Sequence, residues 1–177
     1  MNALDHFSIP YKGLGIGIHD LQFEIDDSFF AAFDSPIVDN GKFDAKLELD
    51  KRADHSILTF EIDGYTNTHC DRCLAAIKLP VNGKYKLHFK FTEDILEEDE
   101  IVFMHPETSI VNVAKYFYDV IGISLPLTKI YDCDSDPEAN CNEAVLAKLG
   151  TGADDTKEQK EDLPSPWDGL KGLSFEE

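Results

Sequence analysis

Four cysteines in two pairs are the feature of this 177-residue chain that most restricts its fold. Cys70 and Cys73 lie in a His-Cys-Asp-Arg-Cys-Leu stretch, and Cys133 and Cys141 follow much later in the chain. A two-residue gap lets both sulfurs of a pair face one ion, and Zn²⁺ binds four thiolates tetrahedrally in structural sites. We therefore expect one structural Zn²⁺ on all four cysteines, forming a clasp between the middle of the chain and its C-terminal third.

Three other interpretations of the cysteines are compatible with the sequence. Seven residues separate Cys133 from Cys141, a less regular gap, so a metal could instead use the first pair with His69 or another residue. The thiols could also be free and buried. Cys70 and Cys73 could form a redox dithiol, although such a motif normally starts a helix within a βαβ unit. Four thiolates would leave zinc no open position for water, which predicts a contribution to folding and not to catalysis.

Charge and hydropathy restrict the compartment and the partners. The N-terminus lacks the features of a signal peptide, and no apolar run approaches the roughly 20 residues of a membrane helix. We therefore expect a cytoplasmic protein without membrane contact, whose thiols stay reduced. A formal net charge of −19 excludes a protein that coats nucleic acid with its whole surface. Any RNA contact must be local, and the acidity suits either a basic protein partner or solubility alone.

Alternating apolar residues predict an antiparallel, β-rich domain of the α+β class. Strands are expected over residues 14–25, 43–49, 57–62 and 77–91. The first would be two strands or one bulged strand, with a turn at His19-Asp20, and the last would be either continuous or a hairpin broken at Asn82-Gly83. Further turns are expected at Asn40-Gly41 and Asp63-Gly64.

Apolar residues at spacings of three and four predict one main helix over Ser109 to Ile121, with Ser109 as its N-cap. Shorter helices are expected over 29–33, capped by the polar residues just before it, and over 141–149. The domain would cover residues 1–149, followed by a polar linker over 150–166. The remaining residues, 167–177, would form a tail that docks on the domain or on a partner through Trp167, Leu170 and Leu173.

A basic strand is unexpected on so acidic a chain. Residues 74–92 contain no Asp or Glu, and alternation would place four basic side chains on one strand face, namely Lys84, Lys86, His88 and Lys90. The lysines of this face, together with Arg72 from the cysteine turn, are our candidate contacts to RNA phosphates. The alternative is an ordinary solvent face whose lysines prevent aggregation or are covered by the acidic stretch at 93–100.

The sequence contains no motif of a catalytic centre. There is no P-loop, H-E-x-x-H or G-x-S-x-G, and the glycines at Gly13, Gly15 and Gly17 lack the spacing of a dinucleotide-binding loop. They are better explained as part of a strand. We therefore expect neither enzyme activity nor a small-molecule substrate.

Several stretches together resemble a known family. They are the Cys-Asp-Arg-Cys-Leu turn after a meander, an apolar helix running into Ile-Ser-Leu-Pro-Leu, a later cysteine pair, and a C-terminal Trp-x-x-Leu-x-x-Leu. Over residues 13–173 the chain is similar to the YceD family, also called DUF177, of bacterial and plastid proteins linked to accumulation of large-subunit ribosomal RNA. The Asp-Ser-Phe-Phe stretch at 27–30 resembles the form of the family found in Bacteroidetes.

The resemblance implies a non-catalytic, zinc-binding factor that supports 23S rRNA accumulation and assembly of the large ribosomal subunit. It would bind that RNA or a basic ribosomal protein. The tail departs from the family pattern, because Ser165 and Pro166 precede Trp167 where the family often has Asp-Pro-Arg, so an arginine that could contact RNA is missing. The acidity and the tail leave open a protein-binding adaptor that never touches RNA, and the first cysteine pair leaves open a redox protein.

Overall fold

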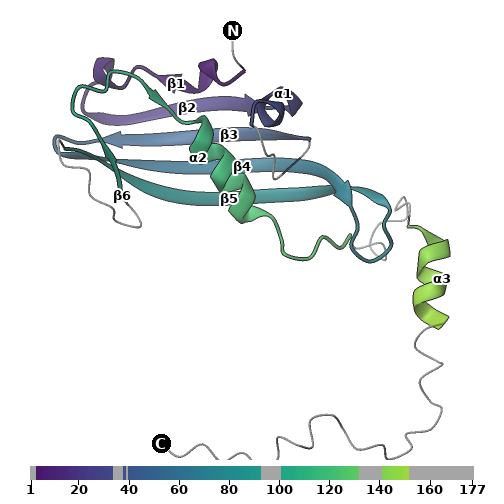
Figure 1. The fold of residues 1–177 in the computed structure, drawn as a ribbon. Helices are drawn as coiled ribbons and strands as arrows, with labels where there is room; N and C mark the ends of the chain where they lie inside the picture. The colour runs from purple at the N-terminus through teal and green to yellow at the C-terminus, as the bar shows by residue number, and fades with distance from the viewer. Residues whose placement is uncertain (1–2, 34–37, 39, 93–100, 132–140, 152–177) are drawn as a thin grey trace, which may run out of the picture.

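A five-stranded sheet forms the centre of the computed structural model, which describes residues 3–33, 38, 40–92, 101–131 and 141–151 (Figure 1). The strands lie side by side in the order β2 (Gly17–Ile25), β3 (Gly41–Lys51), β4 (His55–His69), β5 (Ala76–Phe91) and β6 (Ile101–Met104). The first four form an antiparallel meander, and β6 pairs with β5 in parallel. The predicted α+β class with a mostly antiparallel sheet is therefore confirmed.

One helix covers the sheet. Helix α2 (Ala114–Ser124) packs on β4 and β5 and crosses the sheet diagonally in Figure 1. A second, two-stranded sheet joins β1 (Ser8–Ile9) to β7 (Val111–Asn112). The remaining elements are two 3₁₀ turns (Asp5–Phe7 and Tyr11–Gly13), α1 (Asp27–Ala31) and α3 (Glu143–Thr151). As predicted, α1 begins at a polar cap, because Asp26 accepts a hydrogen bond from the Ser28 N–H at 2.9 Å.

The hydrophobic core lies between the covered face of the sheet and α2. Strand β3 shows why, because its odd-numbered residues from Gly41 to Leu49 are buried and the residues between them are exposed, as the alternation predicted. Phe117 of α2 is fully buried and seals this core. Its ring lies 5.0 Å from that of Phe60 and 5.5 Å from that of Phe23, measured between centroids.

Two predicted turns are wrong, because both lie inside strands. His19 and Asp20 belong to β2, where Leu21 and Phe23 continue one unbroken alternation, while Ile16 and Ile18, which suggested a change of phase, are 75% and 66% exposed. Asp63-Gly64 belongs to β4.

Gly64 allows β4 to lie close to the backbone of β3 and does not form a turn. A Cβ there would overlap the Lys42 carbonyl oxygen and lie 2.7 Å from the Phe43 Cα of β3. Asn82 and Gly83 also lie within a strand, the uninterrupted β5. The open alternative of a hairpin at that point is therefore excluded. Gly13, expected in a strand, ends a 3₁₀ turn.

The main helix begins later than predicted, at Ala114 instead of Ser109, and runs to Ser124. Val111 and Asn112 pair with β1, which removes them from the helix, and Ile110 is 63% exposed. The Asn112 side chain accepts a hydrogen bond from the Ala114 N–H at 2.9 Å and satisfies one of the first helical amides. The predictions for the acidic stretch at 93–100, and for the linker and tail from residue 152 onward, lie outside the described residues.

We expect Gly64→Ala to lower the free energy of unfolding by about 1–3 kcal/mol, because the new methyl group meets the backbone of β3, which cannot rotate away. Gly15→Ala is the control, since a Cβ at that position would meet nothing within 4 Å. Denaturant unfolding of both variants measures the difference. Equal losses would contradict the close packing of β3 against β4 at Gly64.

Candidate functional site

The first cysteine pair lies in the tight turn that joins β4 to β5. The Cys70 N–H donates to the Ala75 carbonyl oxygen at 2.8 Å, and the Leu74 N–H donates to the Cys70 carbonyl oxygen, also at 2.8 Å. These bonds close the turn around two free thiols, Cys70 and Cys73, each of which is 1% exposed. The turn therefore holds two adjacent sulfurs away from solvent.

The segment that follows α2 in the chain lies against this turn, although almost sixty residues separate the two in sequence. The Asp71 N–H donates to the Lys129 carbonyl oxygen at 2.9 Å, and the Lys129 N–H donates back to Asp71 Oδ2 at 2.7 Å. The backbone N–H of Tyr131 donates to the Cys70 sulfur. We call residues 127–131 the strap. Through its own backbone groups, the strap ties the region after α2 to the Asp71 N–H, the Asp71 carboxylate and the Cys70 sulfur of the cysteine turn.

The environment of Cys70 favours its ionised form. Burial alone would raise the pKa of this thiol. The hydrogen bonds that its sulfur accepts from the backbone N–H groups of Tyr131, Cys73 and Arg72 outweigh burial and lower the pKa to about 7. The thiolate is the form that binds metals, so a large share of Cys70 is ready for coordination near neutral pH.

The second cysteine pair is only partly described. Cys133 lies outside the described residues, and Cys141, just before α3, is disulfide-bonded in this structure. Within the described ranges, no group of three or more Cys, His, Asp or Glu side chains is arranged to hold a metal ion. The four-cysteine clasp is therefore not assembled among these residues. His69, the alternative ligand, is exposed at the end of β4.

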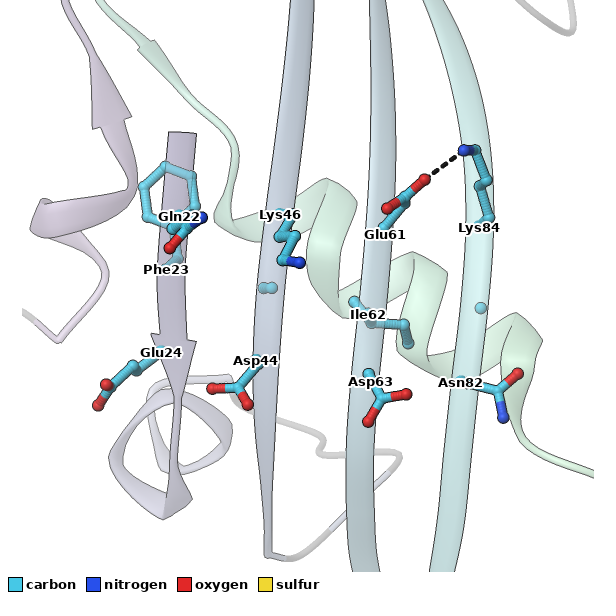
Figure 2. A pocket seen from close by; sticks show the side chains of 12 residues that line it. Gln22, Phe23, Glu24, Asp44, Lys46, Glu61, Ile62, Asp63, Asn82 and Lys84 are labelled. Atoms are coloured by element: carbon cyan, nitrogen blue, oxygen red, sulfur yellow. Dashed lines mark hydrogen bonds and ion pairs between the residues drawn. The ribbon is translucent and has the colours of Figure 1, made fainter. Parts of the chain in front are cut away.

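The predicted lysine face exists on β5. Lys84, Lys86 and Lys90 are exposed, and Phe89 between them is fully buried on the opposite, core face. Lys84 is paired with Glu61 of β4, as the dashed line in Figure 2 shows. This hydrogen bond lowers the pKa of Glu61 and raises that of Lys84.

The structure does not bring Arg72 together with the lysines. Arg72 is exposed in the cysteine turn, where β5 begins at Ala76. Lys84 and Lys90 lie eight and fourteen residues beyond Ala76, which places them roughly 25–45 Å along the strand. The cysteine turn and the lysine face are therefore two separate surfaces.

Sequence reasoning missed an acidic row on the same open face. The acidic row consists of Glu24, Asp44 and Asp63, which are directly opposite one another on three neighbouring strands, and the neutral Asn82 continues it on β5. They line a shallow hollow of about 910 Å³, next to Lys46, Glu61 and Lys84 (Figure 2). Like charges directly opposite each other are destabilising, so the row is not explained by sheet stability. The alternation of charged residues on each strand was visible in the sequence, but the register between strands was not.

These features define a class of protein, namely a mostly antiparallel sheet that is covered on one face by a helix and ends in a turn with two buried cysteines. A family model described as large ribosomal RNA subunit accumulation protein YceD matches residues 58–174, and the chain belongs to this family. The family resemblance found in the sequence is thereby confirmed, whereas the Bacteroidetes form stays a prediction, and the family description names no enzyme activity. No curated protein and no solved structure matches the chain. No helix in the described ranges has the length and apolarity to cross a bilayer.

Proposed function

We propose that this protein is a non-catalytic factor that supports accumulation of 23S rRNA and assembly of the large ribosomal subunit, and that it contacts this RNA through the lysine face of β5. The family match supports the role in RNA accumulation. The observation that supports the RNA contact is the availability of the Lys86 and Lys90 side chains. Both are exposed, and neither makes an ion pair with any residue that the structure describes.

The geometry of these lysines suits an RNA backbone. Residues two apart on a strand lie roughly 6–7 Å from each other, so the row from Lys84 to Lys90 presents a line of basic groups along one strand. Each phosphate that a lysine neutralises releases counterions, which gives affinity without sequence specificity. Lys84 contributes less, because Glu61 already neutralises it.

We also propose that Cys70, Cys73, Cys133 and Cys141 hold a structural Zn²⁺. The support is the cysteine turn, with its two buried thiols and a Cys70 sulfur that accepts the Tyr131 N–H. Cys133 is only two residues beyond Tyr131 in the chain. Cys141 can act as a ligand only after its disulfide is reduced. Such a metal would contribute free energy of folding and would have no open position for chemistry.

The RNA contact predicts the behaviour of a double variant, Lys86→Glu with Lys90→Glu. We expect its affinity for 23S rRNA fragments to fall at least about tenfold near 0.1 M salt, and the slope of log affinity against log salt to fall by about one per lysine. Lys42→Glu is the control, because Lys42 is an exposed lysine at the opposite end of the same sheet face. Filter binding or fluorescence anisotropy over a salt series measures both quantities.

The acidic row favours a second candidate, the binding of a basic ribosomal protein on the same face. If the double lysine variant binds RNA as tightly as the unchanged protein, with the same salt slope, the RNA contact is wrong. The protein would then be an adaptor, and Asp63→Asn in the middle of the row would weaken its binding to the basic partner.

A further inference from the structure

Exposed aliphatic side chains gather at the end of the molecule that carries the cysteine turn. Leu127 of the strap is fully exposed, and Leu74 and Ile130 are 62% and 50% exposed. The three share this end because Leu74 closes the cysteine turn, while Lys129 and Tyr131, on either side of Ile130, bond to Asp71 and Cys70. We call Leu74, Leu127 and Ile130 the turn patch.

Leu74 holds a costly backbone conformation, which the hydrogen bonds of the cysteine turn stabilise, while most of its side chain lies in solvent. Its φ is +59°, a left-handed conformation that a residue with a Cβ adopts at a cost of about 1–2 kcal/mol and that glycine adopts freely. It is the one non-glycine residue with positive φ in the described part of the chain. Glycine would fit this position without strain, so the choice of a leucine whose side chain is 62% exposed points to a use for that side chain outside the turn itself.

The chain itself supplies a segment of matching chemistry. Trp167, Leu170 and Leu173 recur at a spacing of three, which would place them on one face of a helix, and the family match extends to residue 174 and includes them. Helix α3 lies beyond the β4–β5 turn in Figure 1, at the same end as the turn patch, and ends at Thr151.

Fifteen residues, 152–166, lie between Thr151 and Trp167, and a flexible chain of that length spans roughly 19–23 Å. Such a tether gives the segment an effective concentration in the millimolar range near the patch. Weak apolar affinity is then sufficient for docking within one chain.

We propose that residues 167–177 dock on the turn patch of their own chain, with Trp167, Leu170 and Leu173 covering Leu74, Leu127 and Ile130. The docked segment covers the outside of the cysteine turn and the strap. It makes the turn patch an intramolecular binding surface and leaves the lysine face of β5, on another part of the molecule, open.

Trp167 is the only tryptophan of the chain, so its fluorescence tests the proposal in the full-length protein. We expect native protein to emit at a shorter wavelength than the same chain in denaturant, and to be quenched less by acrylamide. Leu127→Gln and Leu74→Gln should each shift the emission toward the denatured value and increase quenching. Neither side chain is buried, so both variants keep the fold. Ile18→Gln is the matched control, an equally exposed aliphatic residue on β2.

Three results would overturn the proposal. They are a native emission equal to that of the denatured chain, emission that is insensitive to Leu74→Gln and Leu127→Gln, and a shift that depends on protein concentration, which would indicate docking on a second copy. None of these readouts involves RNA or metal. Failure of the tail contact is therefore distinguishable from failure of the proposed function.

Discussion

Removal of the proposed Zn²⁺ from reduced protein is expected to lower its melting temperature by about 8–16 °C. A ligand present at a thousand times its dissociation constant stabilises the folded state by about 4 kcal/mol, and a chain of this size loses roughly 2–4 °C per kcal/mol. The measurement is the metal content of protein purified without added zinc in a phosphine reductant, followed by thermal melts before and after a strong chelator. The reductant matters because Cys141 must be released from its disulfide.

Single serine variants identify the ligands. If all four cysteines bind the ion, Cys70→Ser and Cys133→Ser should both abolish stoichiometric zinc. Loss of zinc in Cys70→Ser with full retention in Cys133→Ser and Cys141→Ser would instead assign the site to the first pair with His69 or another residue. Protein that contains no metal, and whose melt ignores the chelator, contradicts the zinc proposal. Rapid alkylation of such protein would favour the redox dithiol.

Phe117→Ala is expected to lower the free energy of unfolding by about 3–5 kcal/mol, because it removes a fully buried ring and leaves a cavity between α2 and the sheet. The rings of Phe60 and Phe23 lose their edge contacts with it at the same time. Equilibrium unfolding in urea measures the loss.

Ile123→Ala on the same helix is the control for Phe117→Ala. This residue is 65% exposed, so its truncation should change stability by about 0.5 kcal/mol or less. If Phe117→Ala lowers the free energy of unfolding by less than about 1 kcal/mol, the packing of Phe117 between α2 and the sheet is contradicted.

The meander was predictable where each strand carries a strict alternation. Strand β3 is the clearest case, because Phe43, Ala45, Leu47 and Leu49 alternate with charged residues and one face of the strand is buried. The lysine face of β5 followed from the same rule. The start of α2 was not predictable, since Val111 and Asn112 fit a helical pattern and leave it only because β1 offers them a partner far away in the sequence.

Glycines misled the turn predictions for a related reason. The dipeptide Asp63-Gly64 has the composition of a turn, but Gly64 is required by the backbone of β3, and a long-range approach of this kind leaves no local signal. Strand β6 is short and pairs in parallel with β5 only over four residues, so its own sequence carried too little pattern to identify it.

The residues of the candidate site could be predicted from the sequence, but the hydrogen bonds that join the strap to the cysteine turn could not. The spacing of Cys70 and Cys73 indicated a tight turn, which the structure contains. The strap was not foreseen, because Lys129 and Tyr131 reach the turn through backbone N–H and carbonyl groups that every residue possesses. The acidic row likewise depends on the register of Glu24, Asp44 and Asp63, which only pairing across three strands defines.

The uninterrupted length of β5 fixes a distance within this molecule. One strand runs from the cysteine turn at Ala76 to Phe91 beyond the last lysine, and its whole length is hydrogen-bonded to β4 from His55 to His69. Lys90 therefore lies roughly 45 Å along the strand from Ala76, where the cysteine turn with Arg72 ends. Shortening that span would require unpairing β4 from β5, the two longest strands of the described sheet, so the distance between the two ends of β5 is fixed.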